Sequence, residues 1–119
     1  MRDKIRDKGR LQHILDAIEK ALAFTENVRF DEYIANVLLK YAVVKCVEIV
    51  GEASYKLTRE FRAQHPEIEW RDIISMRHIL VHGYYQTEDD IVWDTVKNFL
   101  PPLKEQIQIL YDNELNFTS

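Results

Sequence analysis

The sequence is poor in the residues that cross-link chains or interrupt helices. Cysteine occurs once, and glycine and proline occur three times each, in 119 residues. The single Cys46 cannot form an internal disulfide, and so few breaking residues favour long helices. No uninterrupted apolar run approaches the roughly 18 residues that a membrane-spanning helix needs, because the richest stretch, 41–50, contains Lys45 and Glu48. A disulfide-stabilised domain and a membrane protein are therefore not expected.

The overall charge neither suggests nor excludes a nucleic-acid partner. Sixteen basic residues against 20 acidic ones give a formal net charge of -4, so any contact with RNA must come from a local cationic cluster. The N-terminus shows no basic stretch followed by an apolar core and a cleavage site, which predicts a cytoplasmic protein. The length suits a single domain over residues 1–119, large enough to fold around its own core.

Apolar residues recur at three- and four-residue steps through most of the chain, which predicts amphipathic helices. The first helix is predicted around Leu11 to Leu22. A loop over 25–31 follows, and Asp31 is expected to cap a second, long helix. Its predicted apolar stripe consists of Ile34, Val37, Leu38, Tyr41 and Val44 and continues to Tyr55.

Two further helices are predicted in the second half of the chain. The third begins near Glu67 and ends at Gly83, a residue suited to a helix C-terminus. The fourth opens with a capping box formed by Thr87 and Asp90 and runs on to Leu110. Pro101 and Pro102 are expected to kink or restart it.

Together these segments predict an all-α fold, an antiparallel up-and-down bundle of four to five helices. No strand-like alternation, internal repeat or low-complexity linker is present. Three apolar residues lie off the main stripes and leave room for a homodimer interface: Tyr33, Met76 and Trp93.

The segment RHILVHGYY, residues 77–85, concentrates an arginine, two histidines and two tyrosines at the predicted end of the third helix. Arg77 occupies a register where the helix calls for an apolar side chain. A guanidinium there must be paired or must face a shared cavity, because an isolated buried charge is costly. Glu48 and Glu52 on the second helix are the candidate partners. Such a pair could equally do no more than fix the packing of the two helices.

The two histidines allow two kinds of site. His78 and His82 share a helix face at a spacing that could chelate a metal, but two ligands do not make a site, and the sequence has no HExxH pattern or cysteine cluster. We therefore expect no metal cofactor. An imidazole near a helix C-terminus is instead suited to proton transfer, and the planar fork of Arg77 is suited to holding a phosphate.

Arg77 and His82 together suffice for metal-free RNA cleavage, in which the ribose 2'-hydroxyl attacks the adjacent phosphate. In an ideal helix these two residues lie about 140° apart around the axis. They do not share a face, so we favour a site completed by a second subunit across a two-fold axis.

Four segments of the chain carry a family resemblance: LQHILDAIEKA, EIVGEASYKL, HPEIEWRDIISMRHILVHGYY and IVWDTVKNFLPPLKEQI. They resemble the HepT-like group of HEPN proteins, whose motif is Arg, a polar residue, a short spacer and His, then one residue and Tyr. Here the motif residues are Arg77, His78, His82 and Tyr84. The resemblance implies a helical dimer whose two motifs line one cleft, and a metal-independent ribonuclease toxin with Arg77 and His82 as catalytic residues.

The resemblance also implies a partner, an MNT-type minimal nucleotidyltransferase antitoxin. Some such antitoxins transfer AMP onto the motif tyrosine, here Tyr84, and a bulky anionic adduct beside His82 would block the cleft and repel RNA. The chain departs from the commoner pattern at His78, where asparagine is usual, which leaves the role of this position open. Two alternatives remain: a non-catalytic, nucleotide- or substrate-binding adaptor subunit for the nucleotidyltransferase, and a structural dimer in which Arg77 forms an interhelical ion pair.

Overall fold

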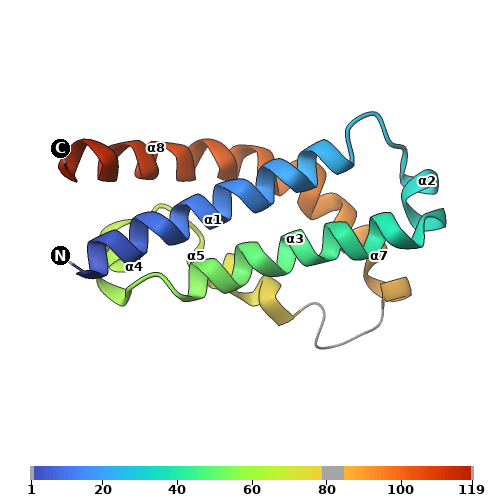
Figure 1. Ribbon diagram of the computed structural model, residues 1–119. Helices are drawn as coiled ribbons and strands as arrows, with labels where there is room; N and C mark the ends of the chain where they lie inside the picture. Colours follow the sequence, from blue (N-terminus) through green and yellow to red (C-terminus); the bar gives the residue numbers. More distant parts are fainter. Residues whose placement is uncertain (1, 79–84, 119) are drawn as a thin grey trace.

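The computed structural model describes the backbone of residues 2–78 and 85–118, and the side chains of residues 6–78 and 89–114 (Figure 1). Every regular element within these residues is helical, which confirms the predicted all-α class. In chain order the elements are α1 (Arg2–Phe24), α2 (Phe30–Ala35), α3 (Val37–Tyr55), α4 (Arg59–Gln64), α5 (Trp70–Ser75), the 3-10 helix η1 (Met76–His78), α7 (Tyr85–Asp94), the π-helix η2 (Thr95–Phe99) and α8 (Leu100–Thr118).

Helix α1 is the centre of the bundle. It packs against α3 on one side and α8 on the other, and both run antiparallel to it (Figure 1). The predicted stripe of α1 is confirmed, because its apolar side chains from Leu11 to Ile18 are buried. They meet valines of α3 and the apolar face of α8. The core includes Leu11, Ile14, Ile18, Val43, Val47, Val50, Val96, Leu100 and Ile107.

The predicted second helix is in fact two helices. Asn36 is extended (φ -110°, ψ 98°), and its side-chain oxygen accepts a hydrogen bond of 3.0 Å from the Leu39 amide, which caps α3. Asp31 does not cap, since it lies in the first turn of α2. The break changes which side chains face inward. The first half of the predicted stripe is therefore wrong: Ile34, Val37, Leu38 and Tyr41 are exposed.

The residues expected at a dimer interface are also placed differently. Tyr33 and Met76 are buried, and Trp93 is partly buried against the core. The rings of Tyr33 and Trp93 pack with centroids 5.0 Å apart. Tyr33 and Met76 are therefore not available to a partner, and the prediction is wrong for these two residues. For Trp93 it stays a prediction.

The predicted third helix ends earlier than expected. Helix α5 begins at Trp70, whose indole N–H donates to the carbonyl of His65 at 2.9 Å. The chain tightens into the 3-10 helix η1 at Met76, where the sequence predicted a continuous α-helix to Gly83. Helix α4, capped by the Thr58 hydroxyl, was not predicted as a separate element.

The fourth predicted helix is confirmed as α7 and α8, which are joined by the π-helix η2. Thr87 lies inside α7, so it is not a cap. At the other end, the amide of Leu100 donates to the carbonyl of Thr95, five residues back, and the chain changes direction at η2 (Figure 1). Pro101 and Pro102 have no N–H to donate, so the helix widens just before them. None of the described helices is long and apolar enough to span a membrane.

Candidate functional site

The backbone of Arg77 lies directly against α3, at Gly51. Gly51 is buried, and a Cβ atom there would collide with the backbone nitrogen of Arg77. The same Cβ would lie 3.0 Å from the carbonyl oxygen of Ile73 and 3.0 Å from the carbonyl carbon of Met76. These neighbours are backbone atoms, which cannot rotate away. Only glycine permits this approach, and the approach sets where η1 rests on α3.

The side chain of Arg77 lies over the ring of Tyr55, with the guanidinium carbon 3.6 Å from the ring centroid. Tyr55 follows Gly51 by four residues and therefore shares its helix face. Tyr55 is 48% exposed and Arg77 is partly exposed, so this cation–π contact lies at the surface. Next to it, Nε of Arg77 donates to Nε2 of His78 at 3.4 Å.

The expected ion pair between Arg77 and helix α3 is not formed. Glu48 accepts a hydrogen bond of 2.8 Å from Lys45, and this contact raises the pKa of Lys45. In the described part of the chain, no carboxylate lies within ion-pair distance of Arg77. An aromatic ring therefore takes the place predicted for Glu48 or Glu52. A supporting role of Glu48 or Glu52 in catalysis stays a prediction.

The other half of the predicted site falls outside the described residues. His82 and Tyr84 belong to 79–84, so the catalytic role of His82 and the modification of Tyr84 stay predictions. Of the predicted catalytic pair, the structure describes only Arg77; it also describes the neighbouring His78. Within the described residues no group of three or more His, Cys, Asp or Glu side chains is arranged to hold a metal ion.

Sequence reasoning missed the two residues that contact Arg77 from α3. Tyr55 was expected to continue the inward stripe, and no role was predicted for Gly51. One signal was available: an isolated glycine inside a strongly apolar helix usually marks a close backbone approach or a packing constraint. The partner of that approach could not be identified without the fold.

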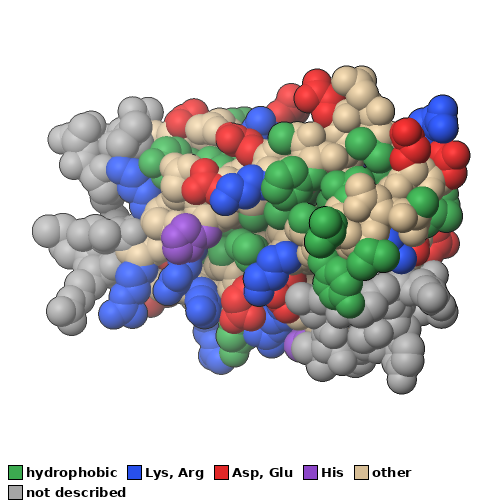
Figure 2. All heavy atoms as spheres, turned by 45° about the vertical axis from the view of Figure 1, so that its right-hand side comes forward, with side chains coloured by type: hydrophobic (Ala, Val, Ile, Leu, Met, Phe, Trp, Pro, Cys, Tyr) green, Lys and Arg blue, Asp and Glu red, His purple; other side chains and the backbone are tan. Residues whose placement is uncertain are grey.

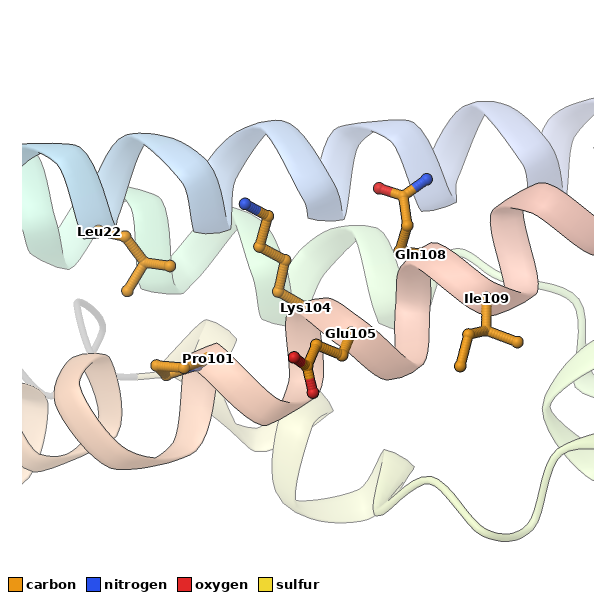
Figure 3. Close-up of a pocket in the computed structure, with 6 residues that line it drawn as sticks. All are labelled: Leu22, Pro101, Lys104, Glu105, Gln108 and Ile109. Atoms are coloured by element: carbon orange, nitrogen blue, oxygen red, sulfur yellow. The ribbon is translucent and has the colours of Figure 1, made fainter.

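A separate groove lies between α1 and α8. It has a volume of about 520 Å³ and is lined by Leu22, Pro101, Lys104, Glu105, Gln108 and Ile109 (Figure 3). Lys104 and Glu105 bring opposite charges to this groove. Among the predicted site residues that the structure describes, none lines this groove. The groove is therefore separate from Arg77 and His78.

The comparisons with known proteins identify the family to which this chain is similar. The profile of the ribonuclease HepT-like family matches residues 14–110, which include α3, α5 and η1. The chain is 36% identical over 103 residues to "Probable ribonuclease HepT" of Thermococcus cleftensis, covering 87% of this chain and 94% of that protein. It is 32% identical over 103 residues to "Putative RNase MJ1380" of Methanocaldococcus jannaschii, with the same coverage of 87% and 94%.

No solved structure gives a significant match. The family profile covers most of the chain, and these relatives are matched over nearly their whole length. The chain therefore belongs to the ribonuclease HepT-like family.

Proposed function

We propose that this protein is a metal-independent endoribonuclease in which Arg77 holds the scissile phosphate and His82 transfers the proton. Family membership and the names of the relatives support RNA as the substrate. The observation that carries the proposal is the environment of the Arg77 guanidinium. Its guanidinium lies at the surface against Tyr55, with no described carboxylate competing for its terminal nitrogens. A cation held in this way is available to an incoming phosphate.

The proposed reaction needs only these two groups and the substrate's own hydroxyl. His82 takes the proton of the ribose 2'-hydroxyl, whose oxygen attacks the adjacent phosphorus. The bond from phosphorus to the 5'-oxygen breaks, and that oxygen receives the proton from the imidazolium. The products are a 2',3'-cyclic phosphate and a 5'-hydroxyl. Arg77 stabilises the negative charge that grows on the phosphoryl oxygens.

We further propose that the active form is a homodimer whose two motifs share one cleft. An exposed apolar surface at the junction of α2 and α3 supports this, since monomeric proteins rarely expose large apolar patches. Hydrophobic side chains reach the surface at the end of the molecule turned forward in Figure 2. The exposed residues are Phe30, Ile34, Val37, Leu38 and Tyr41. Leu38, which is 83% exposed, gives the test: Leu38→Glu should reduce the solution mass to that of a monomer, and an unchanged dimer would refute this interface.

The biological role we propose is that of a toxin, neutralised by an MNT-type nucleotidyltransferase antitoxin through adenylylation of Tyr84. A phosphodiester-linked AMP two residues from His82 would add negative charge beside the phosphate-binding Arg77. Incubation with ATP and such an enzyme should add the mass of one AMP to the protein, and Tyr84→Phe should abolish the addition. Addition to the Tyr84→Phe variant would place the modification elsewhere.

The experiment that tests the nuclease proposal is RNA cleavage by the purified protein in EDTA. Arg77→Ala and His82→Ala should each abolish cleavage while the far-UV circular dichroism spectrum stays helical. His13→Ala is the matched control, because His13 is exposed on α1 and belongs to no proposed step. Cleavage by His82→Ala at the parent rate would overturn the assignment. Loss of parent activity in EDTA would overturn metal independence alone.

A further inference from the structure

We propose that Tyr55 is a positioning residue for Arg77, and that its ring holds the guanidinium in the orientation that binds phosphate. The inference rests on the proposed function, since it gives Arg77 a phosphate to bind. The contact that carries it is the 3.6 Å separation between the guanidinium carbon and the Tyr55 ring centroid.

The kind of partner matters, because a guanidinium has two faces and a donor edge. All five N–H donors lie in its plane, and a phosphate binds along that edge. A carboxylate partner would occupy the same edge and compete with RNA. An aromatic ring instead takes a face of the cation, so the terminal donors stay available while the side chain is held. Tyr55 therefore does what the expected Glu48 or Glu52 partner could not do.

The remaining contacts of Arg77 support the same orientation. Its backbone is fixed where η1 meets Gly51, and its guanidinium is fixed where it meets Tyr55, four residues further along α3. Its Nε donates to His78, which leaves the two terminal nitrogens as the outward donors. An otherwise flexible side chain is thus held at both ends before substrate arrives. Such preorganisation lowers the entropic cost of reaching the transition state.

The ring of Tyr55, not its hydroxyl, makes the contact. No hydrogen bond of the Tyr55 hydroxyl to another described residue is present, and the side chain is about half exposed. Phenylalanine would keep the stacking surface and remove only the hydroxyl. Leucine would keep an apolar side chain and remove the aromatic face. These two substitutions separate a positioning role from ordinary packing.

The first test compares kcat and KM for RNA cleavage in Tyr55→Phe and Tyr55→Leu. We expect Tyr55→Phe to stay within about twofold of the parent and Tyr55→Leu to lower kcat about 3- to 30-fold with a smaller change in KM. Tyr111→Leu on α8, which removes a ring near Lys8, is the matched control and should leave kcat unchanged.

The second test observes the contact without using activity. A guanidinium over an aromatic face has its Nε proton resonance shifted upfield by the ring current. In nuclear magnetic resonance spectra the Arg77 signal should be shifted in the parent and in Tyr55→Phe, and should return to the ordinary position in Tyr55→Leu. Thermal melting establishes that each variant is folded. If Tyr55→Leu does not fold, Tyr55→Met replaces it, with the same expectations.

The outcomes separate this inference from the proposed function. If Arg77→Ala is inactive but Tyr55→Leu matches the parent in kcat, Tyr55 does not position the arginine, and the nuclease proposal stands. If Arg77→Ala cleaves RNA at the parent rate, the catalytic role of Arg77 fails and the positioning role fails with it. An unshifted Arg77 resonance in the parent protein would overturn the stacking itself.

Discussion

Lys40 on α3 and Asp89 on α7 form an ion pair of 3.0 Å in which the two side chains are only 14% and 12% exposed. The pair fixes α7 against the N-terminal half of α3, while Gly51 and Tyr55 fix η1 against its C-terminal half. The chain before and after residues 79–84 is therefore attached to one helix. Helix α3 therefore holds the chain on both sides of the segment that contains His82 and Tyr84.

Removing one partner of this shielded pair should destabilise the protein. Asp89→Ala leaves the Lys40 ammonium largely buried without its counter-charge, which should lower the free energy of unfolding by about 1–3 kcal/mol. Urea denaturation measures the change. Lys45→Ala is the control, because the Lys45–Glu48 pair is on the same helix but more open to solvent and should contribute no more than about 0.5 kcal/mol. Equal losses in the two variants would show that burial of the Lys40 pair does not matter.

Tyr33 should respond to pH in a way that phenylalanine does not. Burial, and next the charge of Asp89, raise the pKa of Tyr33 to about 12. A folded-state pKa above the ordinary value means that the folded protein holds this proton more tightly than the unfolded chain. The associated stability is present below pH ~10 and is lost as pH rises from about 10 toward 12. The unfolding free energy of the parent should therefore fall relative to that of Tyr33→Phe over this range.

At neutral pH the same substitution has a second expected effect. The Tyr33 hydroxyl is buried and finds no hydrogen-bond partner among the described residues. Tyr33→Phe should thus be neutral or should stabilise the fold by about 1 kcal/mol. Tyr111→Phe, at a partly exposed ring, serves as the comparison. A loss of more than about 1 kcal/mol in Tyr33→Phe would show that the hydroxyl is bonded after all.

Two glycines should respond in opposite directions to the same substitution. Gly51→Ala places a methyl group against the backbone of Arg77 and should cost about 1–3 kcal/mol or more. Gly9 lies in α1, and a methyl group added there would meet no atom within 4 Å, so Gly9→Ala should stabilise the protein by about 0.5–1 kcal/mol. Thermal melts of the two variants provide the comparison. A stabilised Gly51→Ala would contradict the close approach of η1 to α3.

Local patterns predicted the fold class because most helices bury a regular stripe. The stripe of α1 is uninterrupted and was identified correctly, whereas that of the second predicted helix continued through Asn36 without a visible break. Because apolar residues lie on both sides of Asn36, the sequence pattern gave no indication that one helix ends and another begins there. The Leu39 amide donates to the Asn36 side chain, and this cap marks the break beyond which Ile34 and Leu38 lie at the surface.

The candidate site was predictable in part for the same reason. The α-helical register predicted an inward Arg77 with a charged partner, but the chain becomes a 3-10 helix at Met76 and the guanidinium lies at the surface. The identity of the partner depends on which face of α3 meets η1, and that is decided by the close approach at Gly51. Charge reasoning therefore selected Glu48 and Glu52, while the structure places Tyr55 there.

The shared-cleft proposal makes a prediction that a single-chain site cannot imitate. If each site takes Arg77 from one subunit and His82 from the other, Arg77→Ala and His82→Ala proteins are inactive alone but complement each other after subunit exchange. Half of the dimers in an equal mixture are then mixed, and each contains one intact site and one doubly defective site. The mixture should recover about a quarter of the parent activity. If both residues act within one subunit, every site in a mixed dimer lacks one group, and no activity returns. Cleavage assays before and after exchange, with the dimer fraction measured by ultracentrifugation, distinguish the two arrangements.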